Sequence, residues 1–230
     1  MAGESADEVA RRAREKAERL LRHAEAYEKG AAGERVVRDV LSTLPVEWFV
    51  IHDLQWPGRR KANVDHVVVG PGGVFVVDTK NWSGDVAVRA GVLRQNGYSR
   101  ATTVEGVRSA ADAIAALVPS LDAEAFTPVI CFAGEGRVEA NLDGVLVCHA
   151  DSLIELLTSR RPLLSMEWVE FLRFDLDMST RGALEPRQAV GGPSAESRPP
   201  AVPSPRRGGM RGLWRRLFLT VALLGVGPPR

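Results

Sequence analysis

Residues 63–80 constrain the fold more than any other part of the chain, because they encode a β-hairpin. Two valine-rich runs flank a Gly-Pro-Gly-Gly turn, and a turn of this kind between apolar runs is a strong hairpin signal. If the turn is symmetric, Val69 pairs with Val74, and the same count outward places Asp65 directly opposite Asp78. The turn therefore predicts both the strands and their register.

Two aspartates and a lysine are expected on one face of this hairpin. Side chains alternate between the faces of a strand, so Lys80 shares the face of Asp78. Directly opposed residues have Cβ atoms about 4.5–5.5 Å apart, so their carboxylates repel, and a buried pair without a cation is costly. In the alternative interpretation the acids face water and Lys80 neutralises them as a surface ion triplet. Valine and phenylalanine occupy both faces of both strands, which favours burial and a divalent-metal site suited to phosphodiester cleavage.

Length and composition indicate one globular domain with appendages. The chain has 230 residues, of which 45% are hydrophobic. Cys131 and Cys148 each lie in an apolar run, so we expect small buried thiols in a reducing compartment rather than a disulfide. The four histidines are scattered without a zinc-binding spacing, so no structural zinc is expected.

Charge is unevenly distributed along the chain. Seven of the 30 basic residues and one of the 29 acidic residues lie from Glu196 onward, which leaves the preceding part with 23 basic and 28 acidic side chains. A mildly acidic body argues against a high-affinity DNA reader. The loop residues Arg59, Arg60 and Lys61 offset part of this charge, either as phosphate contacts or as a solvated basic turn.

The first part of the chain lacks the layout of a signal peptide and reads as a long charged helix over residues 5–29. A second helix is expected to start near Glu34, after the glycines at positions 30 and 33. The stripe on the first helix is thin and mostly alanine, which fits either a short coiled-coil seam or a solvated helix lying on the domain. It consists of Ala13, Ala17, Leu20, Ala24 and Tyr27.

Composition shifts predict five segments. They are a charged helix at 1–29, a domain at 30–150, helices packing on its core at 151–178, a Pro/Gly/Arg-rich linker at 179–212 and a short apolar tail at 213–230. The tail is shorter than the roughly 20 residues that a membrane-spanning helix needs. Residues 206–226 fit an anchor on an anionic membrane surface, or a hydrophobic tail that docks on its own domain. We therefore expect a cytoplasmic protein, held peripherally at the inner face of the membrane if the tail anchors it.

Three stretches of the chain resemble the nuclease-related domain family. They are Gly33-Glu34 at the opening of a helix, the run at 63–70, and the run at 73–84, within a resemblance that covers roughly residues 30–148. The family is similar to the restriction-endonuclease-like PD-(D/E)xK superfamily. The resemblance implies an α/β fold with a restriction-endonuclease-like three-layer core, in which helices flank a mixed sheet. An N-terminal helix and a disordered C-terminal tail would be added to that core.

The resemblance also implies roles for individual residues. Asp65 and Asp78 match the two acidic positions, Lys80 matches the lysine, and Glu34 matches an acid that reaches the metal. Asp65, Asp78, the Thr79 carbonyl and Glu34 would hold Mg²⁺ or Mn²⁺, while Lys80 would orient the nucleophile. As an alternative, Glu34 is an acid placed near a helix N-terminus, where the macrodipole favours it.

One stretch departs from the family pattern. The helix after the hairpin begins with residues 102–106 (Thr-Thr-Val-Glu-Gly), without the glutamine that family members often carry one turn into this helix. Trp82 and Gly84 are interpreted as structural, with base stacking as the alternative role of Trp82.

Taken together, these features predict a metal-dependent nuclease that hydrolyses phosphodiester bonds of DNA. The alternative is a non-catalytic module that binds nucleic acid or is tethered to a membrane through its tail.

Overall fold

The computed structural model describes residues 4–57, 59, 62–134 and 136–181. The last helix extends to Arg181, three residues into the predicted linker. The rest of that linker and the predicted apolar tail at 213–230 lie outside the described residues.

The core is a six-stranded mixed sheet with the strand order β1-β2-β3-β7-β9-β8. Its first three strands are antiparallel, β3, β7 and β9 run parallel, and β8 pairs antiparallel with β9. The strands are β1 Phe49–Gln55, β2 Asn63–Gly70, β3 Gly73–Lys80, β7 Phe126–Phe132, β8 Ala140–Leu142 and β9 Val145–His149.

A small second sheet follows the hairpin. It contains β4 Val86–Arg89, β5 Val92–Gln95 and β6 Tyr98–Ser99. The short apolar runs at 85–88 and 92–93 predict the first two of these strands from the sequence. The sequence does not predict β6 or β8, because two or three residues are too few to show an alternating pattern.

The predicted register of the hairpin is confirmed. Val69 pairs with Val74 across the turn, and the last paired residues before the site are His66 and Val77. Gly73 has φ +124°, a backbone conformation that the tight turn requires and that residues with a Cβ rarely adopt.

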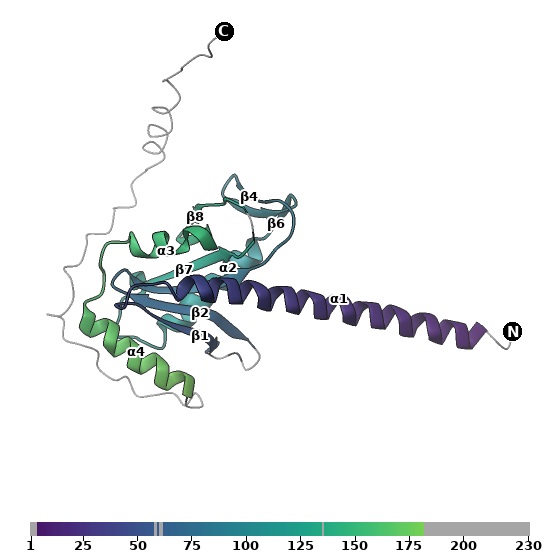
Figure 1. Cartoon of the computed structure of the whole chain (residues 1–230), viewed down its shortest axis with the longest axis horizontal. Helices are drawn as coiled ribbons and strands as arrows, with labels where there is room; N and C mark the ends of the chain where they lie inside the picture. The colour runs from purple at the N-terminus through teal and green to yellow at the C-terminus, as the bar shows by residue number, and fades with distance from the viewer. Residues whose placement is uncertain (1–3, 58, 60–61, 135, 182–230) are drawn as a thin grey trace, which may run out of the picture. The chain divides into compact units, whose positions relative to one another are not determined.

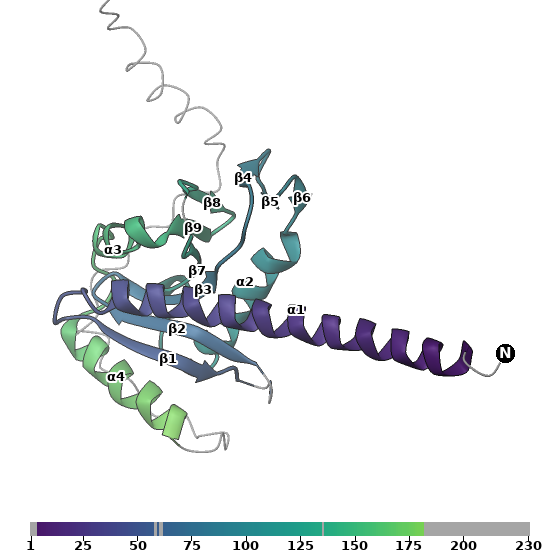
Figure 2. The same ribbon diagram turned by 45° about the vertical axis from the view of Figure 1, so that its right-hand side comes forward.

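Helices cover both faces of the large sheet, which confirms the three-layer α/β core. Helices α2 (Ala101–Ala115) and α4 (Met166–Arg181) pack on the face that carries Val67 and Val76. Helices α1 (Glu4–Leu41) and α3 (Ala150–Thr158) pack on the opposite face, which carries Phe75. A short 3₁₀ helix, Ala123–Ala125, precedes β7. Figure 2 shows α1 crossing the strands of the hairpin, in agreement with its contacts to β3.

The expectation of two N-terminal helices was wrong, because α1 continues through Gly30 and Gly33 without a break. The packing of α1 on the domain outweighs the low helix propensity of glycine. A Cβ at Gly33 would lie 2.7 Å from the Cβ of Asn81, so glycine lets the helix approach the end of β3. The Asn81 side-chain amide donates a 2.8 Å hydrogen bond to the Lys29 carbonyl.

The earlier turns of α1 do not lie on the domain, contrary to one of the two interpretations of the alanine stripe. All side chains at positions 11–29 are exposed, including Leu20 at 62% and Tyr27 at 75%. Figure 1 shows this stretch of α1 extending away from the strands, and exposed ion pairs such as Arg11 with Glu15 line it. The coiled-coil interpretation of the stripe stays a prediction.

Two further expectations concern the cysteines and the membrane. Cys131 and Cys148 are free thiols, fully buried, and stand side by side on β7 and β9, as predicted. In the part of the chain that the structure describes, none of the helices is long and apolar enough to cross a membrane.

Candidate active site

The ends of β2 and β3 bring Asp65, Asp78 and Lys80 together. The Lys80 ammonium donates a 2.7 Å hydrogen bond to Oδ1 of Asp78, and it lies 3.2 Å from the carbonyl oxygen of Thr79. The Thr79 backbone N–H donates a 2.7 Å hydrogen bond to Oδ2 of Asp65. The three side chains that the sequence predicted on one face therefore meet at one place.

These groups are half-buried, and burial raises the pKa of the two carboxyl groups. The side chains of Lys80 and Asp78 are 24% and 28% exposed. Burial, and then the charge of Asp78, raises the pKa of Asp65 to about 6, although the Thr79 N–H and Lys80 oppose the shift. Burial also raises the pKa of Asp78, against the opposing effect of Lys80. Both carboxylates are thus poorly compensated by the protein alone.

A pocket of about 230 Å³ opens above the carboxylates. Strands β2 and β3 supply its polar floor, helix α2 supplies the facing wall, and the Trp56 indole closes part of its rim. The lining residues are Trp56, Asn63, Val64, Asp65, Val76, Val77, Asp78, Lys80, Thr103, Gly106, Val107 and Ala110.

The acceptors left in the pocket fit a hard divalent cation. Asp65 and Asp78 each have one carboxylate oxygen engaged, and the other makes no hydrogen bond with the described residues. Together with the Thr79 carbonyl, these oxygens are the ligand type that Mg²⁺ and Mn²⁺ prefer, with water completing the shell. The repulsion between the two aspartates is the kind that a cation relieves.

Glu34 stands apart from this group. Its charge contributes to the raised pKa of Asp65 as the smallest of the causes, but it is not among the residues lining the pocket. No set of three or more His, Cys, Asp or Glu side chains gathers within metal-binding reach among the described residues. The alternative role of Glu34 near a helix N-terminus is wrong, because α1 begins thirty residues earlier, at Glu4.

Comparison with known proteins agrees with this geometry. Residues 29–133 match the family model of the nuclease-related domain. This segment is similar to the nuclease-related domain family. An uncharacterized protein of Bacillus anthracis is 41% identical over 59 residues, which cover 24% of this chain and 28% of that relative. The chain therefore spans about a quarter of the curated relative that it matches. No solved structure matches the chain significantly.

Trp82, which lies in the segment matched to that family, has a structural environment. Its ring lies 5.3 Å from that of Phe132, and the Arg100 guanidinium lies 5.4 Å from its centroid. Gly84, with φ +86°, makes the turn that lets the Asn96 side chain accept a hydrogen bond from the Asp85 N–H. Trp82 does not line the pocket, so its structural interpretation is the better supported one.

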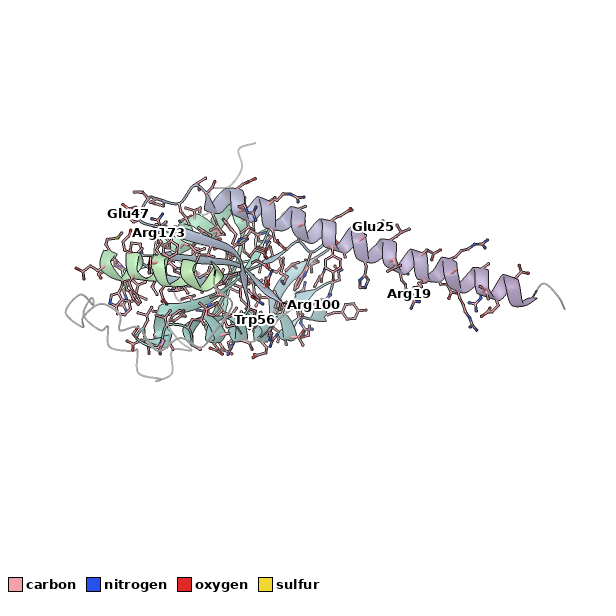
Figure 3. The ribbon with its side chains drawn as sticks, turned by 90° about the horizontal axis from the view of Figure 1, so that it is seen from below. Arg19, Glu25, Glu47, Trp56, Arg100 and Arg173 are labelled. Atoms are coloured by element: carbon pink, nitrogen blue, oxygen red, sulfur yellow. The ribbon has the colours of Figure 1, made fainter. Side chains whose placement is uncertain are left out.

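The aromatic residue at the pocket is Trp56, which sequence reasoning missed. The Arg59 guanidinium lies 4.2 Å from the centroid of its ring. Figure 3 labels Trp56 on the domain, and Arg19 and Glu25 on the exposed stretch of α1. The neighbouring Arg60 and Lys61, also predicted to contact phosphate, lie outside the described residues. The signal in the sequence that could have identified Trp56 is its position just before the basic loop.

Proposed function

We propose that the nuclease-related domain is a metal-dependent nuclease that hydrolyses phosphodiester bonds of DNA. The observation that carries the proposal is the meeting of two carboxylates and an ammonium at the floor of one pocket, where Asp65, Asp78 and Lys80 converge. The family of the domain supports the same chemistry.

Asp65, Asp78 and the Thr79 carbonyl would hold Mg²⁺ or Mn²⁺. When bound, such a cation polarises a phosphoryl oxygen and lowers the pKa of water. The Thr79 N–H fixes one oxygen of Asp65, which leaves its other oxygen directed to binding. Glu34 would add negative potential near Asp65 without lining the pocket.

Lys80 would act on the nucleophile and on the developing charge. Its ammonium is fixed by Asp78 and by the Thr79 carbonyl, so it enters the pocket from a defined direction. A positive group held in this way orients the attacking water and stabilises negative charge on the phosphate oxygens in the transition state.

The test is a cleavage screen with the full chain and labelled single-stranded, duplex and branched DNA, and RNA, in Mg²⁺ or Mn²⁺. We expect cleavage by the wild-type protein and none by Asp78→Ala or Lys80→Ala. The exposed α1 residues Asp39 and Lys29 supply matched controls, Asp39→Ala and Lys29→Ala, which should cleave like the wild type. Wild-type protein that is inert on every substrate would overturn the proposal in favour of a non-catalytic module.

A further inference from the structure

The pocket has two unlike sides. Its floor carries the charged groups of β2 and β3, whereas its α2 wall presents the uncharged side chains of Thr103, Val107 and Ala110 and no side chain at Gly106.

Gly106 has no structural need to be glycine. It lies inside α2, where glycine costs about 1 kcal/mol relative to alanine, and its φ is not positive. A Cβ built there meets nothing within 4 Å, in contrast to Gly33, where it would collide with Asn81. Since Gly106 lines the pocket, a side chain at this position would take up ligand space. Glycine therefore keeps the pocket open at the expense of helix stability.

Trp56 gives the same pocket an aromatic surface. The indole is half-buried and packs against the core between the sheet and α2, so the ring is held in place. Stacking of a base on an aromatic side chain contributes about 1–3 kcal/mol. The Arg59 guanidinium, 4.2 Å from the centroid of the ring, adds a positive charge beside the indole, which suits contact with a nucleic-acid phosphate.

We propose that this pocket accepts one unpaired nucleotide next to the scissile phosphate, with Gly106 setting the space and Trp56 the stacking surface. A volume of about 230 Å³ suits a single nucleoside and not a base pair. A paired base must first leave its stack, at a cost of a few kcal/mol. The domain therefore prefers single-stranded nucleic acid to duplex. This inference rests on the proposed function, because it assumes that Asp65 and Asp78 act on a phosphodiester.

Binding can be measured separately from cleavage. The full chain carrying Lys80→Met keeps both carboxylates, and in Mg²⁺ its affinity for a labelled single-stranded oligonucleotide is compared by fluorescence anisotropy with that for the blunt duplex. We expect at least about tenfold tighter binding of the single strand, since each 1.4 kcal/mol is a factor of ten. In the same background Trp56→Ala should lose about five- to 150-fold in affinity for the single strand, and Trp56→Phe should restore most of it.

Gly106→Leu tests the space in the pocket. It should abolish the preference for the single strand, whereas Gly30→Leu, which adds the same side chain to an open helical position of α1, should leave the preference intact. Thermal melting checks the fold of each variant. If Gly106→Leu fails to fold, Gly106→Ala and the Trp56 pair test the same pocket.

The outcomes separate the two proposals. Equal affinity for single strand and duplex, or unchanged affinity in the Trp56→Ala and Gly106→Leu proteins, would overturn the nucleotide pocket. Cleavage by the wild type with no dependence on Trp56 or Gly106 would overturn the pocket and keep the nuclease. Selective binding without any cleavage by the wild type would overturn the nuclease and keep the pocket.

Discussion

Asp65 and His66 are neighbours in β2, yet they illustrate two different solutions for a buried ionisable group. Asp65 faces α2 and the pocket, and its pKa is raised to about 6. His66 faces α1 and is 1% exposed, and burial, followed by the influence of His52 and Arg38, lowers its pKa to about 3. Burial favours the neutral form in both cases, so the shifts have opposite directions.

The two sites differ in how their polar atoms are satisfied. Nδ1 of His66 and Nδ1 of His52 lie 2.8 Å apart, and two neutral rings can form this hydrogen bond without any ligand, although the buried Nε2 of His66 has no partner among the described residues. Asp65 accepts one hydrogen bond from the Thr79 N–H and then faces Asp78 across an open pocket. A pair of neutral rings needs no counter-ion, whereas an open pair of acids leaves a place for a cation.

The largest expected difference between the two sites is in catalysis. Asp78→Asn should lower the cleavage rate at least about 100-fold, because it removes a negative cation ligand from the pocket. His66→Phe, on the other face of the sheet, should change the rate less than tenfold. Single-turnover cleavage assays of both variants measure this contrast, and a comparable loss in both would mean that the two faces are not functionally distinct.

Low pH should reduce the free energy of unfolding through the protonation of His66 in the unfolded chain. Because the folded pKa lies below the unfolded value, the folded form binds fewer protons, and stability is lost as the pH falls from about 6.5 toward 3. This one group contributes a slope approaching about 1.4 kcal/mol per pH unit. Denaturant titrations between pH 7 and pH 4.5 should show a shallower decline for His66→Phe than for the wild type. If the stabilities of the wild type and of His66→Phe declined in parallel with pH, His66 would not be the source of the loss.

A divalent metal should stabilise the fold through Asp65 and Asp78, and the effect should not depend on His66. At a free Mg²⁺ or Mn²⁺ concentration of 100 times Kd, binding to the folded form adds about 2.7 kcal/mol. The wild type and His66→Phe should therefore melt at a higher temperature in Mn²⁺ than in EDTA, whereas Asp65→Asn and Asp78→Asn should not. Calorimetric titration provides the affinity, and an equal gain in all four proteins would place the metal elsewhere.

Without metal, Asp65 should reduce stability at neutral pH. Its folded pKa is raised above the unfolded value, so its favourable contribution is complete below about pH 4 and is lost as the pH rises through about 6. Asp65→Asn can still accept the Thr79 N–H, and in EDTA at pH 7.5 it should be about 1–3 kcal/mol more stable than the wild type. The advantage should vanish near pH 4. Chemical denaturation at pH 7.5 and at pH 4 measures the difference in stability between the two proteins. An Asp65→Asn protein less stable than the wild type at pH 7.5 would contradict the prediction.

Glu34 should have the smallest effect of these residues. It influences Asp65 through its charge and does not line the pocket, so Glu34→Gln should change the cleavage rate less than about tenfold. Metal titration of the same variant should show a modest loss of affinity. A loss as large as that of Asp78→Asn would make Glu34 a direct ligand after all.

The hairpin was predictable because its turn residues, and the alternation of side chains between the two faces of each strand, are local features of the sequence. A Gly-Pro-Gly-Gly turn fixes the pairing of Val69 with Val74, and the register places Asp65, Asp78 and Lys80 on one face. The resemblance to a family added the chemistry of these residues.

The other features depend on contacts between distant segments. The continuity of α1 depends on the fit of Gly33 against Asn81, which no local helix propensity reports. Trp56 and Gly106 are 50 residues apart in sequence, and only the packing of α2 on the hairpin brings them to one pocket.

Helix α1 also has a mechanical consequence. Its 38 residues make a rod of about 57 Å at 1.5 Å per residue, and only its last turns pack on the domain. The Lys29 carbonyl and Gly33 contact Asn81, the residue that follows Lys80. Such a rod acts as a lever that pivots beside Asn81, so a force on the outer turns is transmitted to the end of β3.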